Sequence, residues 1–206
     1  MPPPPPRRGR ARPWDEGSYA ALDFETTGLD LERDAVVSFG VVPVDNGRAK
    51  VGGSIHQLVR PEVPPSPRSQ TFHLLRPLDL AEAPTMRETA EDLRRRLARR
   101  FLLAWFAEVE VHFLAKSLGG SVRTWRRRTI DVRNLAIAVD GRPPSIRDEH
   151  GYPLSGLARR YGVPVAAPHE AYDDALVTAQ LFLVLVSKLP GRPRPSIRDL
   201  VRIAGA

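Results

Sequence analysis

The 206-residue sequence contains no cysteine, and very little of its positive charge comes from lysine. Without cysteine, neither a disulfide framework nor a cysteine-ligated zinc site can form. Long hydrophobic runs are also absent, because the longest apolar stretch, "ALVTAQLFLVLV" at 175–186, is too short and interrupted to span a bilayer. The first residues show no apolar signal-peptide core. We therefore expect a soluble, cytoplasmic protein with no membrane partner.

Arginine supplies most of the positive charge. Lysine and arginine together number 31 against 24 acidic residues, so the net charge is +7 and the pI is about 10.5. This balance favours an anionic partner, nucleic acid above all. Hydrophobic residues make up 42% of the chain, which is typical of a folded domain rather than a disordered protein.

Segments rich in proline and arginine flank the centre of the chain. Residues 1–17, with "MPPPPPRRGRARP", are expected to form a flexible tail. Residues 18–188 carry the regular apolar patterns of one domain. Residues 189–206 are again basic and are expected to form a C-terminal tail, in which "IRDLVRIA" suits a short helix.

The domain begins with three segments typical of strands: "SYAALDF", "AVVSFGVVPVD" and "KVGGSIHQLVRP". The Asn46-Gly47 pair between the second and third predicts a hairpin, so the three strands should be adjacent and antiparallel. Downstream, short apolar strands at 101–105 and 129–132 alternate with helical patterns. We predict helices at 86–100, 107–120, 133–139, 153–162 and about 170–188. The pattern predicts an α/β fold with a mixed five-stranded sheet, a three-strand antiparallel meander plus two parallel strands, flanked by helices.

Acidic residues lie where predicted strands end or helices begin. Asp23 and Glu25 are two residues apart on the first strand, so their side chains share one face and repel each other unless a cation lies between them. Glu108 and Glu110 follow the strand "FLLAW", and Asp174 lies in "HEAYDDA" at the start of the last long helix. Hard cations such as Mg²⁺ and Mn²⁺ prefer such oxygen ligands, and paired ions assist phosphoryl displacement.

These motifs resemble those of the DEDDh 3′–5′ exonucleases. The resemblance rests on "DFETTG" at 23–28, a carboxylate ahead of "HFL", and His169 five residues before Asp174. That family includes the proofreading epsilon subunit of bacterial DNA polymerase III, RNase T and oligoribonuclease, and it has the RNase H-like fold. The resemblance covers roughly residues 18–188.

The resemblance implies a site for two Mg²⁺ or Mn²⁺ ions held by Asp23, Glu25 and Asp174, with Glu110 supporting one of them. It implies that His169 acts as the general base. Residues five apart on a helix are about 140° apart around its axis, so His169 should lie in the loop before the helix. The implied activity is removal of nucleoside monophosphates from the 3′ end of single-stranded or frayed DNA, or of RNA.

The second motif departs from the family pattern. The family usually has "LVAHNAxFDxxFL", where this chain has "LLAWFAEVEVHFL". Trp105 and Phe106 replace the usual His-Asn pair, and Glu110 replaces the usual Asp. Glutamate keeps the charge but adds a methylene, so Glu108 remains a competing candidate for this position.

Five residues around the motifs are predicted to meet the substrate: Phe24, Thr26, Thr27, Phe72 and His73. The family's "IHGI" segment corresponds to "FHLL" at 72–75, in which Leu74 replaces the glycine. The side chain of Phe24 points away from the acids, so its simplest interpretation is a core residue.

The predicted partner is nucleic acid with a free 3′ end, and a polymerase or other protein is a second candidate. Two rival interpretations are an exonuclease fold that binds nucleic acid or protein with little turnover, and an exoribonuclease. Nothing in the residues separates DNA from RNA, because a 2′-OH contact has no sequence pattern of its own. Trp125, among the arginines of "RTWRRRTID", suits either a single-strand stacking platform or a charged edge strand.

Overall fold

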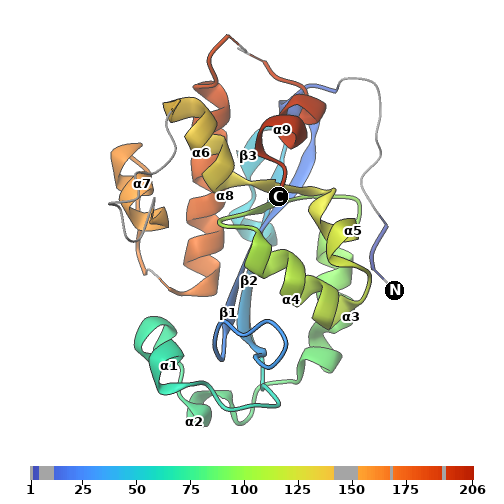
Figure 1. Ribbon diagram of the computed structural model, residues 1–206, viewed down its shortest axis with the longest axis vertical. Helices are drawn as coiled ribbons and strands as arrows, with labels where there is room; N and C mark the ends of the chain where they lie inside the picture. The colour runs from blue at the N-terminus through green and yellow to red at the C-terminus, as the bar shows by residue number, and fades with distance from the viewer. Residues whose placement is uncertain (1, 5–11, 142–152, 168, 192–193) are drawn as a thin grey trace.

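A mixed sheet forms the centre of the molecule in the computed structural model, which describes residues 2–4, 12–141, 153–167, 169–191 and 194–206. The order of strands along the sheet is β3-β2-β1-β5-β6 (Figure 1). β1 (Ser18–Thr26) pairs antiparallel with β2 (Val36–Asp45). β5 (Phe101–Ala104) and β6 (Thr129–Asp131) continue the sheet parallel to β1. The predicted mixed α/β class is confirmed.

The third predicted strand is divided in two. β3 (Arg48–Ala49) and β4 (Ile55–Leu58) both pair with β2, and a 3₁₀ turn, η2 (Val51–Gly53), separates them. The two consecutive glycines weaken the strand at this point, since glycine gains little from a pleated sheet. The predicted hairpin at Asn46-Gly47 is confirmed, and both residues adopt the positive φ angles of such turns, 53° and 66°.

Helices cover both faces of the sheet and its carboxyl edge (Figure 1). The helices predicted from periodicity are all present among the described residues, and short additional ones precede and follow them. Their bounds are α1 (Pro67–His73), α2 (Pro77–Leu80), α3 (Met86–Leu97), α4 (Glu108–Leu118), α5 (Val122–Arg126), α6 (Val132–Asp140), α7 (Leu154–Arg160), α8 (Ala171–Ser187) and α9 (Ile197–Ala204).

The alternation of β1 builds two hydrophobic cores. Tyr19 and Ala21 face the core that contains the apolar side of α8. Leu22 and Phe24 face the opposite core, which is closed by α3 and α4. This period of two leaves Asp23 and Glu25 on the α8 side of the strand, next to the sheet's carboxyl edge.

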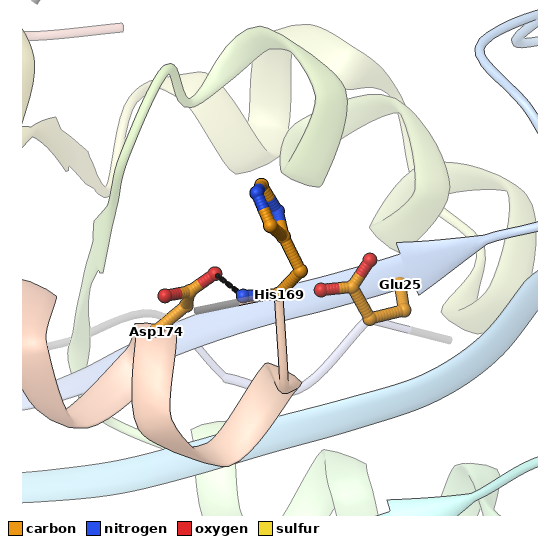
Figure 2. A group of neighbouring side chains, drawn as sticks. All are labelled: Glu25, His169 and Asp174. Carbon is orange, nitrogen blue, oxygen red and sulfur yellow. Dashed lines mark hydrogen bonds between the residues drawn. The ribbon is translucent and has the colours of Figure 1, made fainter. Parts of the chain in front are cut away.

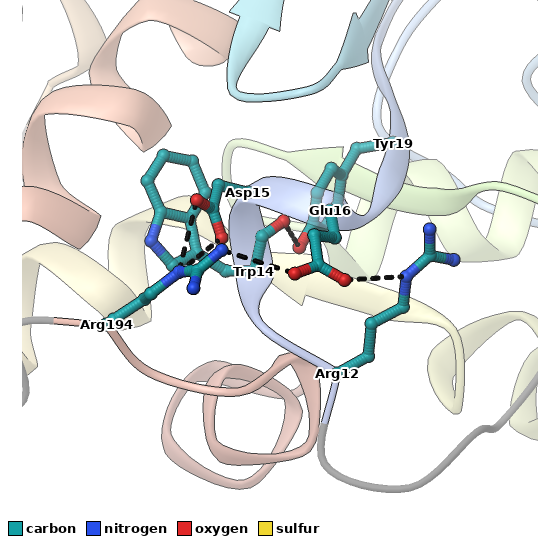
Figure 3. A network of polar contacts seen from close by, with 6 residues as sticks. All are labelled: Arg12, Trp14, Asp15, Glu16, Tyr19 and Arg194. Atoms are coloured by element: carbon teal, nitrogen blue, oxygen red, sulfur yellow. Dashed lines mark hydrogen bonds and ion pairs between the residues drawn. The ribbon is translucent and has the colours of Figure 1, made fainter.

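The N-terminal segment predicted as a tail packs onto the domain in both of its described parts, residues 2–4 and 12–17. The carbonyls of Pro3 and Pro4 accept hydrogen bonds from Arg128 and from the N–H of Arg99. Trp14 in the short helix η1 (Trp14–Glu16) packs edge-on against Phe182, with ring centroids 6.0 Å apart. Arg194 forms an ion pair with Asp15 at 3.0 Å, joining the two ends of the chain (Figure 3). The prediction missed this contact because a single Trp within a charged, proline-rich stretch carries no periodicity.

The C-terminal segment also differs from the predicted tail. α9 buries Ile197, Leu200 and Ala204 in the same core as α8 and lies against α6. Its apolar residues recur every three to four positions, which suits a helix that covers a core. The predicted helix in this segment is therefore confirmed, but the segment packs on the domain instead of forming a separate tail. Among the described residues, no helix combines the length and apolar character that crossing a membrane requires.

Candidate active site

Two carboxylates project from the carboxyl-terminal half of β1 toward α8. Asp23 pairs with Gly40 of β2 in the sheet, and Glu25 pairs with Ser38. Burial raises the pKa of Asp23 well above its usual range, and the nearby acids Glu25, Glu110 and Asp174 raise it further. Burial and Asp174 raise the pKa of Glu25 to about 8. The strand thus holds two acids where neither is well solvated.

Glu110 brings a third carboxylate from the first turn of α4. Its side chain is buried, with 5% of the residue exposed, and its Oε2 atom has no hydrogen-bond partner among the described residues. Burial raises its pKa well above the usual range, and the carboxylates of Asp131 and Glu25 raise it further. A buried carboxylate oxygen without a donor is costly unless a cation or water satisfies it.

Asp174 supplies the fourth carboxylate from the first turn of α8. Its Oδ2 atom accepts a hydrogen bond of 3.0 Å from the backbone N–H of His169. This bond and the His169 charge lower the pKa of Asp174, but burial outweighs both and leaves it raised. Ligand atoms of Glu25, His169 and Asp174 lie within 4.8 Å of one another (Figure 2).

His169 lies in the loop before α8, as predicted, and is exposed. Its φ angle is 64°, a left-handed conformation that turns the chain sharply before the helix. The imidazole ring packs edge-on against Phe72 of α1, with ring centroids 5.6 Å apart. The loop therefore brings the histidine beside the acids and beside an aromatic ring that is 50% exposed.

A glycine allows α8 to approach the sheet at this site. A Cβ atom on Gly40 would lie 2.1 Å from the carbonyl oxygen of Ala171 and 2.6 Å from the Cα of Tyr172. Only glycine fits so close to a backbone. Because Gly40 pairs with Asp23, this contact fixes the start of α8 directly over the first acid.

The four acids lie close enough for their charges to interact, and two of them, Glu25 and Asp174, form a tighter group with His169. Like charges in a buried site raise each other's pKa, as they do here, and a divalent cation removes that repulsion. The unpartnered Oε2 of Glu110 supplies an independent sign of a missing positive partner. All-oxygen carboxylate sets match hard cations such as Mg²⁺ and Mn²⁺, so the residues fit the predicted ions.

The alternative acid, Glu108, does not join this group. Its carboxylate is 58% exposed and forms an ion pair with Arg126 at 3.4 Å. Both interpretations of Trp125 are wrong: it lies in the helix α5 and not in an edge strand, and it is fully buried, so it cannot stack on a nucleic-acid base. Its indole N–H donates to the carbonyl of Gly119.

The predicted substrate contacts divide into exposed and buried residues. Phe72 is half-exposed beside His169. His73 is 7% exposed; its Nδ1 accepts a bond of 3.0 Å from the N–H of Leu75, and burial lowers its pKa. Thr26 is 8% exposed and donates to the carbonyl of Gly28 at 2.6 Å.

Two of these predictions need correction. The Phe24 side chain is core, packed edge-on against Phe39 and Phe113, so only its backbone lies near the acids. Thr27 is fully buried, and its hydroxyl donates to Asp34 and accepts from Ala35 N–H. Its side chain therefore holds the β1–β2 connection rather than facing a substrate.

One residue next to the site was missed from the sequence. Asp131 ends β6 and caps α6, accepting from the N–H groups of Arg133 and Asn134. Its other oxygen accepts a bond of 2.9 Å from Ala107 N–H, immediately before α4. Asp131 thus ties the helix that carries Glu110 to the sheet. The sequence could have indicated this role, because an acid between a short strand and a helix is typical of a helix N-cap.

Comparison with known proteins places this site in a family. Residues 20–182 match the family model described as "Exonuclease" (RNase_T). The 3′–5′ exonuclease DinG of Staphylococcus haemolyticus is 26% identical over 187 residues, which cover 89% of this chain and 20% of that protein. DinG of Staphylococcus aureus strain MRSA252 is 24% identical over the same length and coverage. The chain spans about a fifth of the length of these curated relatives.

Solved structures share the fold. Exonuclease X in complex with 5′ overhanging duplex DNA superposes with a TM-score of 0.68 at 21% identity, covering 91% of this chain and 99% of that one. The zinc-bound Escherichia coli ExoI–ssDNA complex gives a TM-score of 0.70 at 13% identity, covering 85% and 42%. These neighbours confirm the RNase H-like architecture. With the family model matching most of the domain and the acids gathered at one edge of its sheet, the chain belongs to the DEDDh 3′–5′ exonuclease family.

Proposed function

We propose that this domain is a metal-dependent 3′–5′ exonuclease that removes nucleoside monophosphates from single-stranded or frayed DNA. The observation that carries the proposal is the convergence of Asp23, Glu25, Glu110 and Asp174, whose mutual repulsion calls for a cation. An oxygen-only site of this charge is of little use to a protein that merely binds a polyanion, because it repels phosphate when empty.

The residues divide into metal ligands and a proton acceptor. Asp23, Glu25 and Asp174 would hold two Mg²⁺ or Mn²⁺ ions, with Glu110 supporting one of them. When bound, such paired ions stabilise charge on both the attacking and the leaving oxygen of a phosphodiester. Acids on three separate elements fix the site without needing a flexible loop.

His169 would take the proton from the attacking water. Histidine titrates near neutral pH, which suits a general base, and the exposed loop position lets the ring reach a substrate at the acids. The water oxygen forms a bond to phosphorus, and the bond from phosphorus to the 3′ oxygen of the preceding nucleotide breaks. That oxygen gains a proton, and the products are a nucleoside 5′-monophosphate and a strand shorter by one residue.

DNA is the substrate that the relatives favour. The solved neighbours include exonucleases complexed with single-stranded DNA and with an overhanging duplex. The strongly basic composition supports a polyanionic partner in general. A cytoplasmic location and a polymerase or other protein partner remain part of this proposal, as does activity on RNA.

The direct test uses 5′-labelled single-stranded DNA, 3′-recessed duplex and RNA of the same sequence, each with Mg²⁺, Mn²⁺ or EDTA. We expect shortening from the 3′ end only with metal. Asp23→Ala and Asp174→Ala should lower the rate by on the order of a thousandfold, since metal assistance is worth several kcal/mol and about 1.4 kcal/mol is tenfold. Asp173→Ala is the matched control. No metal-dependent shortening by the parent would refute the proposal.

The second candidate function is a binding module with weak turnover. The Trp105, Phe106 and Glu110 replacements in the second motif favour it. The same assay separates the two functions: a module binds labelled oligonucleotide but leaves its length unchanged in Mg²⁺ and in Mn²⁺.

A further inference from the structure

Phe106 occupies a position that ordinary packing does not explain. It follows β5 by two residues, its φ angle is 57°, and 47% of the residue is exposed. A left-handed conformation costs a bulky residue roughly 1–2 kcal/mol. Leaving an aromatic ring half in water forfeits much of the burial that would offset this cost. Strain of this kind gathers at functional sites.

Arg133 lies over this ring. Its guanidinium carbon is 5.2 Å from the centroid of Phe106, within the range of a cation–π contact. Within the described part of the chain, its side chain takes part in no hydrogen bond or ion pair. Its charge lowers the pKa of Asp131, yet both oxygens of that acid already accept hydrogen bonds from backbone N–H groups. The Arg133 charge is therefore available to a phosphate.

The pair stands at the same edge of the sheet as the acids. Ala104 pairs with Asp131 across β5 and β6, so Phe106 and Arg133 each lie two residues beyond paired positions. Ala21 pairs with Leu103, so residue 105 continues level with Asp23 on the neighbouring strand. Neighbouring strands are about 4.8 Å apart. Glu110 lies four residues after Phe106, in the first turn of α4.

A second arginine–aromatic pair in the protein has a purely structural role. The Arg128 guanidinium lies 5.5 Å from the Trp125 ring, but both residues are buried and both donate to backbone carbonyls. The Phe106–Arg133 pair has the same chemistry without the burial or the backbone partners. Packing therefore accounts for the first pair and not for the second.

We propose that Phe106 and Arg133 form a stacking platform for an unpaired base of the substrate strand beside the acid site. The ring face that Arg133 does not cover would provide a surface for any base, and the guanidinium would face the adjoining phosphate. A base that stacks on Phe106 has left the double helix, so the platform selects a single strand over an intact duplex. This inference rests on the proposed function, because it assigns a subsite to that function's substrate.

The test measures binding of a fluorescein-labelled oligothymidylate by anisotropy in EDTA, with Asp174→Asn present in every protein compared, so that neither catalysis nor the full charge of the empty acid site interferes. Phe106→Asn is the informative variant, because Asn tolerates positive φ and should leave the unfolding midpoint unchanged or raised. We expect it to weaken binding at least about fivefold, since base stacking on an aromatic ring contributes about 1–3 kcal/mol. It should also reduce the preference for single strand over blunt duplex.

Arg133→Gln tests the charge separately. We expect weaker binding and a salt dependence of log Kd that is shallower by about 0.7, the value for one phosphate contact on a single strand. Arg160→Gln is the matched control, because its guanidinium lies 5.8 Å from the Tyr161 ring away from this edge. It should bind like the parent.

The proposal is overturned if Phe106→Asn and Arg133→Gln both bind within about twofold of the parent, if Arg160→Gln loses as much, or if the parent binds no single strand. Shortening in Mg²⁺ by the protein without Asp174→Asn tests the proposed function independently. Binding through Phe106 without shortening of the oligonucleotide by that protein refutes the exonuclease and leaves the platform standing.

Discussion

Asp23 is a residue whose chemical role and contribution to stability oppose each other. Burial and the neighbouring acids raise the pKa of Asp23 in the folded, metal-free protein, so its carboxylate destabilises the fold at pH values above the ordinary pKa of aspartate. We predict that Asp23→Asn raises the free energy of unfolding in EDTA at pH 8, because it removes this buried charge. Urea melts of parent and variant at pH 8 measure it. An unchanged or lower midpoint would contradict this account of the site.

Glu110 is the residue where this chain departs from its family at the acids. The two acids can be compared directly, because the Oε2 atom of Glu110 is buried without a partner among the described residues, while the carboxylate of Glu108 is exposed and paired. We predict that Glu110→Gln lowers the metal-dependent shortening rate by about 10–100-fold, as loss of a supporting ligand does. Glu108→Gln should stay near the parent rate. The reverse order of effects would transfer the ligand role to Glu108.

Leu74 carries a conformational cost that the family's usual glycine avoids. It ends α1 with a φ angle of 60° and is 76% exposed. We predict that Leu74→Gly stabilises the protein by about 0.5–1 kcal/mol, since little burial is lost and the left-handed strain disappears. Leu78 is equally exposed but lies inside α2, so Leu78→Gly should destabilise by a similar amount. Chemical denaturation of both variants measures these two changes in the free energy of unfolding.

At the scale of elements, α8 and β2 form the contact on which the site's geometry depends. Gly40→Ala must move the first turn of α8, and Asp174 moves with it. We predict a loss of stability of about 1–3 kcal/mol from overpacking and a rate reduced by about 100-fold, the effect expected of an ångström-scale displacement of catalytic groups.

The control for this change is Gly52→Ala in the turn between β3 and β4. No atom lies within 4 Å of a Cβ built there, so rate and stability should remain close to those of the parent. Equal behaviour of the two alanine variants would show that the close approach does not position the acids.

Some of these elements and their contacts could be predicted from the sequence, and others could not. β1 was predictable as a short apolar run at 19–22, and α8 as a long stretch that is apolar on most sides. Thr27 was not, because its burial depends on bonds to Asp34 and Ala35 that form only when the β1–β2 connection folds back. Of the site, the two outer motifs carry their acids in recognisable patterns. The choice of Glu110 over Glu108 required the orientation of α4.

At the scale of the whole molecule, the two ends of the chain stabilise the domain together. Trp14 packs on Phe182, and its carbonyl accepts a bond of 2.7 Å from the Tyr19 hydroxyl. We predict that Trp14→Ala lowers the free energy of unfolding by about 3 kcal/mol, within the range for loss of a large aromatic side chain from a core. Thermal or urea melts measure the change.

Arg194→Gln removes the ion pair with Asp15 instead. Because the pair is exposed, its loss should cost less than about 1 kcal/mol. If the two variants were equally destabilised, the charges rather than the ring would hold the ends in place. Neither variant should alter the rate of shortening, since both residues lie far from the acids along the sheet.

The pairing of the two ends also determines how the domain would respond to mechanical tension. Trp14 N–H donates to the Pro195 carbonyl, and Ile197 N–H donates to the Arg12 carbonyl, so the segments run antiparallel. A force applied at residues 12 and 197 would peel these bonds apart one after another instead of shearing them together. The contact between the two segments would therefore yield at low load, while the C-terminal segment would stay attached until the buried side chains of α9 left the core.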